Sequence, residues 1–263
     1  MPGDDALLAV RVLGAGPPLL LINGYAASKD DWDPGFLDAL GRTSTVVCPD
    51  NRGIGASPPA GGDLGVASMA ADVLALMDAR EIEVADVAGW SMGGFVAQTL
   101  AAAAPGRVRR LVLLSTDAGG PGAVAAQLDV WKALVDQSGT PREQATRLLG
   151  LLFPVGLAAS IDAQFGEVVA TARASLLPGT LAAQESAMTR WHAESADERL
   201  QAITAPALIA AGTEDQVIPP ANAELLADAL AGSRLALFDG GGHAFMAQEP
   251  ERLAGLITEW LGR

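Results

Sequence analysis

The sequence predicts an α/β fold: a mostly parallel sheet of seven or eight strands, flanked by helices and carrying a helical lid insertion. Short apolar runs alternate with helical patterns along most of the chain, which is typical of a parallel sheet covered on both faces. The alternation stops between residues 118 and 200, where only helical patterns occur. The 263 residues, half of them hydrophobic, suffice for one large domain.

Each predicted element has a local signal. The strand candidates are short, β-rich apolar runs at residues 7–13, 18–22, 45–48, 84–88, 110–115, 207–211 and 234–238. Helical patterns outside the insertion cover residues 68–79, 94–104, 220–230 and 250–261. The last is the clearest, because Pro250 suits a first helical position and apolar residues follow at the spacing of one helix face.

Residues 118–200 are expected to form a lid over the carboxyl edge of the sheet. Thr140 and Glu143 make a capping box, which predicts a helix that continues through Leu152. An earlier helix is predicted from apolar residues that share one face: Val124, Leu128, Trp131 and Val135. The domain organisation that follows is a core of residues 1–117 and 201–263 with a lid of 118–200, in one compact unit.

Composition excludes several classes of function. The net charge of −14 disfavours nucleic acid and anionic membrane surfaces as partners. Cys48 is the only cysteine, so no intramolecular disulfide forms, and we expect a buried structural thiol. The start of the chain lacks a signal-peptide pattern, and no apolar run approaches the roughly 20 residues that cross a bilayer. A cytoplasmic protein is therefore expected.

The pentapeptide Gly-Trp-Ser-Met-Gly at residues 89–93 lies between a predicted strand and a predicted helix. A turn this tight holds its central residue in strained backbone angles and requires very small flanking residues. The turn would expose the Ser91 hydroxyl at the N-terminus of a helix, where free N–H groups face a developing negative charge. The context therefore predicts a nucleophilic serine.

A serine needs a base, which is usually a histidine oriented by a carboxylate. Of the two histidines, His243 lies in a glycine-rich loop after the last predicted strand. Asp215 directly follows another predicted strand, so both belong to the sheet edge that carries Ser91. Asp117, after the strand that precedes the insertion, is an alternative orienting acid. No metal site is predicted, because no cysteine or histidine cluster accompanies the two histidines.

These segments resemble the α/β-hydrolase superfamily over nearly the whole chain. Residues 89–93 are similar to its nucleophile elbow, residues 213–219 to its acid loop and residues 242–243 to its histidine loop. Residues 50–57 resemble the family's D-x-R-G-x-G-x-S turn, which is usually structural. The nearest look-alikes are serine esterases, cofactor-free haloperoxidase-type perhydrolases and carbon–carbon bond hydrolases. A serine at position 91 argues against the aspartate-nucleophile branches of the superfamily.

Residues 20–25 resemble the loop that helps to form the family's oxyanion hole. The resemblance implies that the backbone N–H groups of Tyr25 and Met92 would bind the oxyanion. Asn23 stands where many relatives carry histidine, which puts the loop geometry in question.

The resemblance implies a cofactor-free serine hydrolase that cleaves an apolar carboxylic ester or lactone through an acyl-enzyme, with Ser91, Asp215 and His243 as the triad. The insertion contains few charges, which favours a small apolar substrate. The candidate substrate-binding residues are Tyr25, Trp90, Trp131 and Trp191. The alternatives are a carbon–carbon bond hydrolase of a diketone-like substrate, a perhydrolase on the same triad, or a receptor with low turnover.

Overall fold

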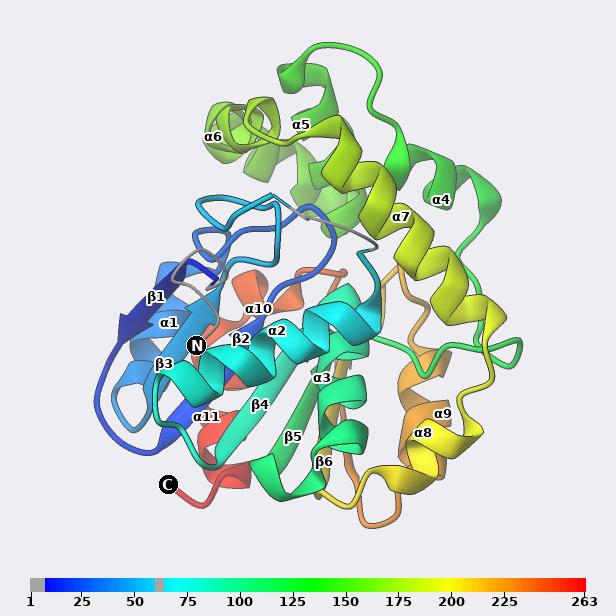
Figure 1. Ribbon diagram of the computed structural model, residues 1–263. Coiled ribbons are helices and arrows are strands. Elements are labelled where there is room, and N and C mark those ends of the chain that lie inside the picture. The colour runs from blue at the N-terminus through cyan, green and yellow to red at the C-terminus, as the bar shows by residue number, and fades with distance from the viewer. Residues whose placement is uncertain (1–7, 60–63) are drawn as a thin grey trace.

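One seven-stranded sheet organises the part of the chain that the computed structural model describes, residues 8–59 and 64–263 (Figure 1). The strands lie in the order β1-β3-β2-β4-β5-β6-β7. Their bounds are β1 Val10–Leu13, β2 Pro18–Ile22, β3 Thr45–Pro49, β4 Ala85–Trp90, β5 Val108–Leu114, β6 Ala207–Gly212 and β7 Arg234–Phe238. Strand β1 pairs antiparallel with β3, and all other described pairs of adjacent strands are parallel. The mostly parallel sheet is thus confirmed, although Leu7 of the predicted first strand lies outside the described residues.

Helices cover both faces of the sheet. The core helices are α1 Pro34–Gly41, α2 Val66–Ala79, α3 Met92–Ala103, α9 Ala221–Ala229, α10 Phe245–Gln248 and α11 Pro250–Trp260. Strand β2 shows how one apolar run serves two cores, because successive side chains point to opposite faces. Leu20 and Ile22 pack with α2 and α3, whereas Leu19 and Leu21 pack with α1 and α11. The continuous apolar run that predicts this strand reflects burial on both faces.

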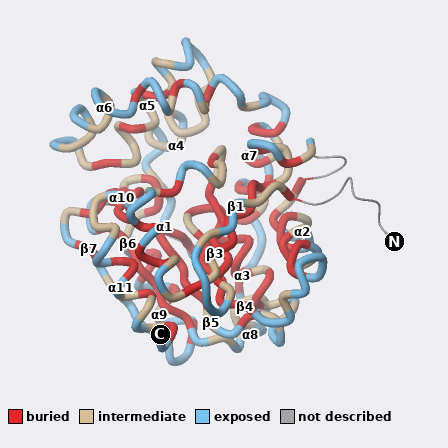
Figure 2. Tube along the Cα trace, turned by 90° about the vertical axis from the view of Figure 1, so that its left-hand side faces the viewer, coloured by how far each residue is buried: buried red, intermediate tan, exposed pale blue. Residues whose placement is uncertain are grey.

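Five helices lie between β5 and β6. They are α4 Leu128–Val135, α5 Pro141–Leu152, α6 Val155–Ala174, α7 Pro178–Ala193 and α8 Asp197–Ala202. Helices α4 to α7, here called the helical insertion, rise above the carboxyl edge of the sheet (Figure 1). Buried residues concentrate in the sheet and are sparse in α5 and α6 (Figure 2). Helices α5 and α6 therefore bury fewer of their residues than the core does.

Two details of the insertion differ from the prediction. Val124 lies before α4, so only the later residues of the predicted apolar face are helical. Helix α8 packs against α3 of the core instead of joining the helices above the sheet. The capping box, in contrast, is confirmed, since Thr140 Oγ1 accepts from Glu143 N and α5 ends at Leu152 as predicted.

Within residues 8–59 and 64–263, no helix combines the length and the apolar character that crossing a bilayer requires. Cys48 lies wholly buried in β3. Burial is the main cause that raises the pKa of its thiol to about 12. The thiol therefore stays protonated and packs as a small apolar group.

Candidate active site

Ser91 occupies the predicted strained turn, between the end of β4 and the start of α3. Its φ of 56° and ψ of −125° are unfavourable for a residue with a Cβ. The glycines on either side permit the turn, because a Cβ on Gly93 would lie 2.1 Å from Ile22 O and one on Gly89 would lie 2.2 Å from Gly93 O. Hydrogen bonds hold the serine backbone: Ser91 N donates to Leu114 O at 2.9 Å. The local sequence thus builds a rigid serine at the carboxyl edge of the sheet.

The predicted base and acid meet at the same edge. His243 Nδ1 lies 2.8 Å and 3.0 Å from the two carboxylate oxygens of Asp215. Asp215 Oδ1 also accepts from the backbone N–H groups of Val217 and Ile218, both at 2.9 Å, which orients the carboxylate. Both side chains are buried, with 2% of the His243 side chain exposed and none of Asp215. The Nδ1–H···carboxylate arrangement leaves Nε2 as the ring nitrogen for proton transfer.

Trp90 joins the histidine loop to the serine turn. Its indole Nε1–H donates to the backbone carbonyl of His243 at 3.0 Å, and the two ring centroids are 5.3 Å apart. The Trp32 ring also packs against Trp90, with ring centroids 6.2 Å apart. Because Trp90 directly precedes Ser91, this hydrogen bond places the histidine backbone next to the turn. We find Trp90, predicted as a substrate-binding residue, in a positioning contact with His243.

The predicted oxyanion loop passes against the serine. A Cβ on Gly24 would lie 3.0 Å from Ser91 Cβ and 3.5 Å from Ser91 Oγ. Met92 is the first residue of α3, so its N–H is among the groups that have no acceptor within the helix. The Asn23 side chain turns back into the loop, where its Nδ2 donates to Ser28 O. The backbone carbonyl of Asn23 accepts from Asn51 Nδ2 at 3.0 Å. Asn23 therefore stabilises the loop through its side chain and its backbone.

A cavity of about 520 Å³ opens beside Ser91, between the sheet edge and the helical insertion. Most of its wall is apolar and comes from four regions: Phe95 of α3, Val124–Leu134 around α4, Met188 of α7, and Val217 with Ile218 after β6. Trp131, a candidate substrate-binding residue, lines this cavity, whereas Trp191 is only 3% exposed and stacks on Phe95 with ring centroids 4.6 Å apart. The ionisable residues in this wall are Asp117 and His192.

Asp117 does not orient His243 but binds the end of α7. Its Oδ2 lies 3.1 Å from His192 Nε2, and its Oδ1 accepts from Trp191 Nε1 at 3.0 Å and from Gly119 N at 2.7 Å. Asp117 therefore pairs with His192, whereas Asp215 is the carboxylate that contacts His243. Sequence reasoning missed this pairing, because nothing local links residues 75 positions apart.

The environment of His192 favours its charged form. Its Nδ1 lies 2.9 Å from Met188 O, so both ring nitrogens face oxygen acceptors. Burial alone would lower the pKa of His192, but the hydrogen bond and the charge of Asp117 outweigh burial and raise it above its usual value. An imidazolium, with an N–H on each nitrogen, satisfies both acceptors.

The D-x-R-G-x-G-x-S turn is a structural element. Asp50 is fully buried, and its carboxylate accepts from Lys29 N at 2.6 Å and Ala56 N at 3.1 Å. Ser57 Oγ donates to Asp50 O at 2.7 Å, and Arg52 pairs with Asp72. These contacts tie the turn to the loop that carries Gly24.

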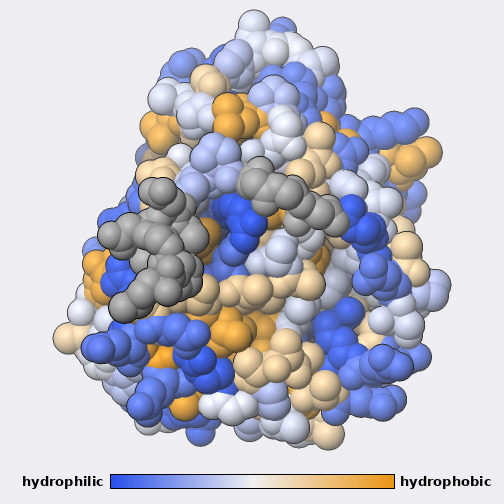
Figure 3. Space-filling view, viewed as in Figure 1, coloured by the Kyte–Doolittle hydropathy of each residue, from blue (hydrophilic) through white to orange (hydrophobic). Residues whose placement is uncertain are grey.

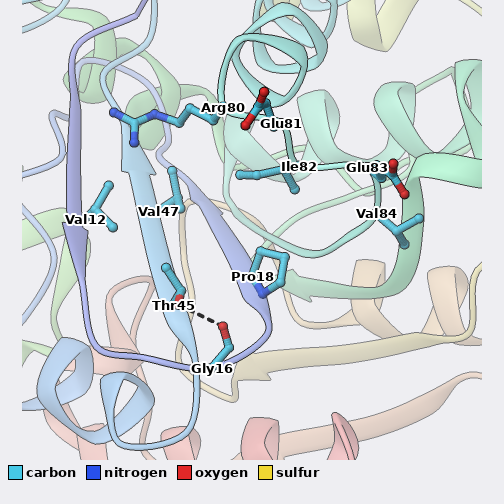
Figure 4. Close-up of a pocket in the computed structure, with 10 residues that line it drawn as sticks. All are labelled: Val12, Gly16, Pro18, Thr45, Val47, Arg80, Glu81, Ile82, Glu83 and Val84. Carbon is cyan, nitrogen blue, oxygen red and sulfur yellow. Dashed lines mark hydrogen bonds between the residues drawn. The ribbon is translucent and has the colours of Figure 1, made fainter.

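A second cavity, of about 610 Å³, lies at the amino ends of β2 and β4, at the opposite edge of the sheet (Figure 4). Val12 and Val84 border it and are both nearly half exposed. On the face of the molecule seen in Figure 3, hydrophobic residues gather at the lower centre. The charged residues of this second cavity follow α2, and its wall contains no serine, cysteine or histidine among the described residues. Across those same residues, no cluster of three or more histidine, cysteine or acidic side chains is arranged to hold a metal ion. The chemistry therefore points to the Ser91 cavity.

The family model described as alpha/beta hydrolase fold matches residues 17–250. The chain belongs to the α/β-hydrolase fold family. A putative carbamate hydrolase, RutD, of Azorhizobium caulinodans is 34% identical over 99% of this chain and 97% of its own length. The 2-hydroxymuconate semialdehyde hydrolase of Pseudomonas sp. strain CF600 is 32% identical over 94% of this chain and 88% of its own length.

Among solved structures, a hydrolase from Pseudomonas aeruginosa PA01 superposes with a TM-score of 0.84 at 32% identity. The alignment covers 97% of this chain and 94% of that one. Family and relatives together identify the chain as a hydrolase. The bond that it cleaves differs among the relatives and has to be argued from its own site.

Proposed function

We propose that this α/β-hydrolase cleaves a carboxylic ester or lactone through an acyl-enzyme on Ser91. The observation that carries the proposal is the strained serine, which borders an apolar cavity while the buried His243–Asp215 pair is tied to its turn by Trp90. Each group of the Ser–His–Asp chemistry comes from a loop at one sheet edge.

In the proposed reaction, Ser91 Oγ attacks the carbonyl carbon while His243 Nε2 takes the hydroxyl proton. The N–H groups of Tyr25 and Met92 bind the oxyanion, and each such donor stabilises the transition state by about 3–4 kcal/mol. His243 then returns the proton to the departing alkoxide, which leaves the acyl group on the serine. Water, activated by the same histidine, releases the acid and restores Ser91.

Carbon–carbon bond hydrolysis is the second candidate, and the resemblance to 2-hydroxymuconate semialdehyde hydrolase favours it. The same serine and histidine would then act on a ketone carbonyl, with a carbanion as leaving group. Turnover of a short ester, its β-diketone analogue and its carbamate analogue distinguishes these reactions. We expect the largest kcat/KM for the ester.

The Ser91→Ala variant tests the nucleophile. Turnover of short p-nitrophenyl esters should fall by about 10⁴-fold or more, because the triad acts as a unit. A neutral alkyl phosphonate should label the wild type at Ser91 and leave the variant unlabelled. Ser233→Ala is a matched control, since Ser233 precedes β7 at the opposite sheet edge and its hydroxyl bonds only Ala227 O among the described residues.

Two outcomes would contradict the proposal. Turnover at the wild-type rate in Ser91→Ala would show that Ser91 is not the nucleophile. Stoichiometric labelling of Ser91 without multiple turnover of any ester, carbamate or diketone would instead indicate a receptor on this fold.

A further inference from the structure

The carboxyl end of helix α5 meets the acid loop next to Asp215. A helix leaves its last four carbonyl groups without a partner inside the helix. Gln216, the residue after Asp215, satisfies two of these carbonyls in α5. Its side-chain Nε2 donates to Gly150 O at 3.0 Å and to Leu151 O at 3.3 Å. The acid loop thereby caps a helix of the insertion.

The histidine loop meets the same end of α5. The backbone N–H of Ala244, the residue after His243, donates to Leu152 O at 3.0 Å. The approach is close, because a Cβ on Gly242 would lie 2.6 Å from Leu152 O and 3.1 Å from Phe153 Cα. Three of the last four carbonyls of α5 are therefore bonded to residues that directly follow the catalytic acid and the catalytic base.

The bonds to α5 complement a bond within the core. Glu214 N donates to Gly241 O at 2.8 Å, so the two loops are joined to each other ahead of their catalytic residues. Gln216 and Ala244 come after those residues, and their donors reach α5. Each loop is thus held before its catalytic residue by the core and after it by the insertion. A loop held on both sides keeps its side chain within the narrow range of positions that proton transfer requires.

We propose that Gln216 is a positioning residue, which uses the carboxyl end of α5 to hold His243 and Asp215 in the geometry that proton transfer requires. The insertion then has two roles, since α4 and α7 wall the substrate cavity and α5 supports the acid and the base. Within the described part of the chain, the cavity wall contains neither Gln216 nor residues 150–152. Loss of the contact should therefore lower kcat and not substrate affinity. The inference deepens the proposed function and rests on it for the reaction at Ser91.

A pair of matched amide variants tests the inference. Gln216→Met removes the donor but keeps the length of the side chain. We expect kcat for p-nitrophenyl acetate to fall about tenfold or more and KM to change less than about threefold, because a small displacement of the acid–base pair is costly. Gln144→Met is the control, because the Gln144 amide also donates to two carbonyls, Gln137 O at 2.8 Å and Gly139 O at 3.3 Å, but within the insertion. It should leave kcat unchanged.

A third variant tests for rescue. Gln216→Lys replaces the amide by an ammonium group, which also donates to the last carbonyls of a helix. This variant should retain more of kcat than Gln216→Met does.

Backbone hydrogen exchange provides a readout that needs no turnover. The Ala244 N–H donates to Leu152 O and lies far from Gln216 in sequence, so its exchange reports on the docking of α5 and not on the acid loop alone. Gln216→Met should accelerate exchange at Ala244 by about tenfold or more. Gln144→Met should leave this exchange rate unchanged. Thermal unfolding of both variants verifies that they fold.

Two results would overturn the inference. The first is a kcat in Gln216→Met equal to that in Gln144→Met. The second is a lower kcat without faster exchange at Ala244, which would show that Gln216 acts on Asp215 alone and not through α5. Failure of the proposed function is distinguishable, because it would appear in the turnover of Ser91→Ala while the difference in exchange remained.

Discussion

Two histidine–aspartate pairs lie at the sheet edge that carries Ser91, one made by the core and one made where the helical insertion meets the core. His243 and Asp215 come from the loops after β7 and β6. His192 of α7 and Asp117, after β5, border the cavity that contains Ser91. The pairs have the same chemistry and similar distances, so composition alone does not tell which one can act as a base.

The use of the ring nitrogens separates them. His243 gives only Nδ1 to its carboxylate in the hydrogen bonds of the described residues, so Nε2 keeps a lone pair for the serine proton. His192 directs Nε2 to Asp117 and Nδ1 to the Met188 carbonyl. A general base needs an uncommitted lone pair. His192 therefore fits a structural cation that fastens α7 to the sheet edge, and His243 fits the catalytic role.

The largest expected effect comes from exchanging the two carboxylates for amides. Asp215→Asn should lower kcat on p-nitrophenyl acetate by about 10⁴-fold, because the amide favours the wrong tautomer of His243. Asp117→Asn should retain kcat within about tenfold and raise KM, since it loosens α7 and leaves the hydrogen bond between His243 and Asp215 in place. Thermal unfolding of both variants checks that they fold. A severe loss in Asp117→Asn with Asp215→Asn spared would assign the orienting acid to Asp117.

Signals that lie within short sequence segments explain why much of the fold, and the pair of His243 and Asp215, could be predicted. The strained turn at Ser91 requires small flanking residues that are contiguous in sequence, so its signal is complete within residues 89–93. Strands buried on both faces read as apolar runs, and β2 and β7 have the predicted bounds. The parallel order of strands then brings Asp215 and His243 to one edge.

The remainder depends on contacts between distant segments. Asp117 and Asp215 both follow strands, and only the packing of α7 decides that Asp117 meets His192. Helix α1, Pro34–Gly41, was not predicted because its capping residue and single proline give a short signal. The buried Nε of Arg173, which has no hydrogen-bond partner among the described residues, is likewise invisible in sequence, since only the folded chain decides which acceptors surround it.

A smaller effect should follow from removing the Trp90 hydrogen bond to the His243 carbonyl. Trp90→Phe keeps an aromatic ring against the histidine but loses the Nε1–H donor, so kcat should fall by about tenfold with little change in KM. Trp32→Phe is the matched control, because the Trp32 Nε1 has no partner and only the ring packs against Trp90. Equal losses in the two variants would show that ring volume, not the hydrogen bond, positions His243.

The smallest effect tests the charge of His192. Its pKa is raised in the folded protein, so the pair stabilises the fold fully below the unfolded value of 6.5 and loses this contribution as the pH rises through the folded pKa. Wild type should exceed His192→Gln in free energy of unfolding at about pH 6, and the difference should shrink by about pH 9. Its size should be about 1 kcal/mol or less, because the imidazole is 37% exposed to solvent.

Urea unfolding of wild type and His192→Gln at both pH values measures this difference. The charged neighbours of the imidazole include Asp117, and Arg199 acts on the same carboxylate while Glu194 acts on Arg199. In an Asp117→Asn background, the stability difference between His192 and His192→Gln should no longer depend on pH, since the carboxylate that raises the pKa of His192 is gone. A difference that stays constant from pH 6 to pH 9 would mean that the pKa of His192 is not raised in the folded protein, which would contradict its assignment as a structural cation.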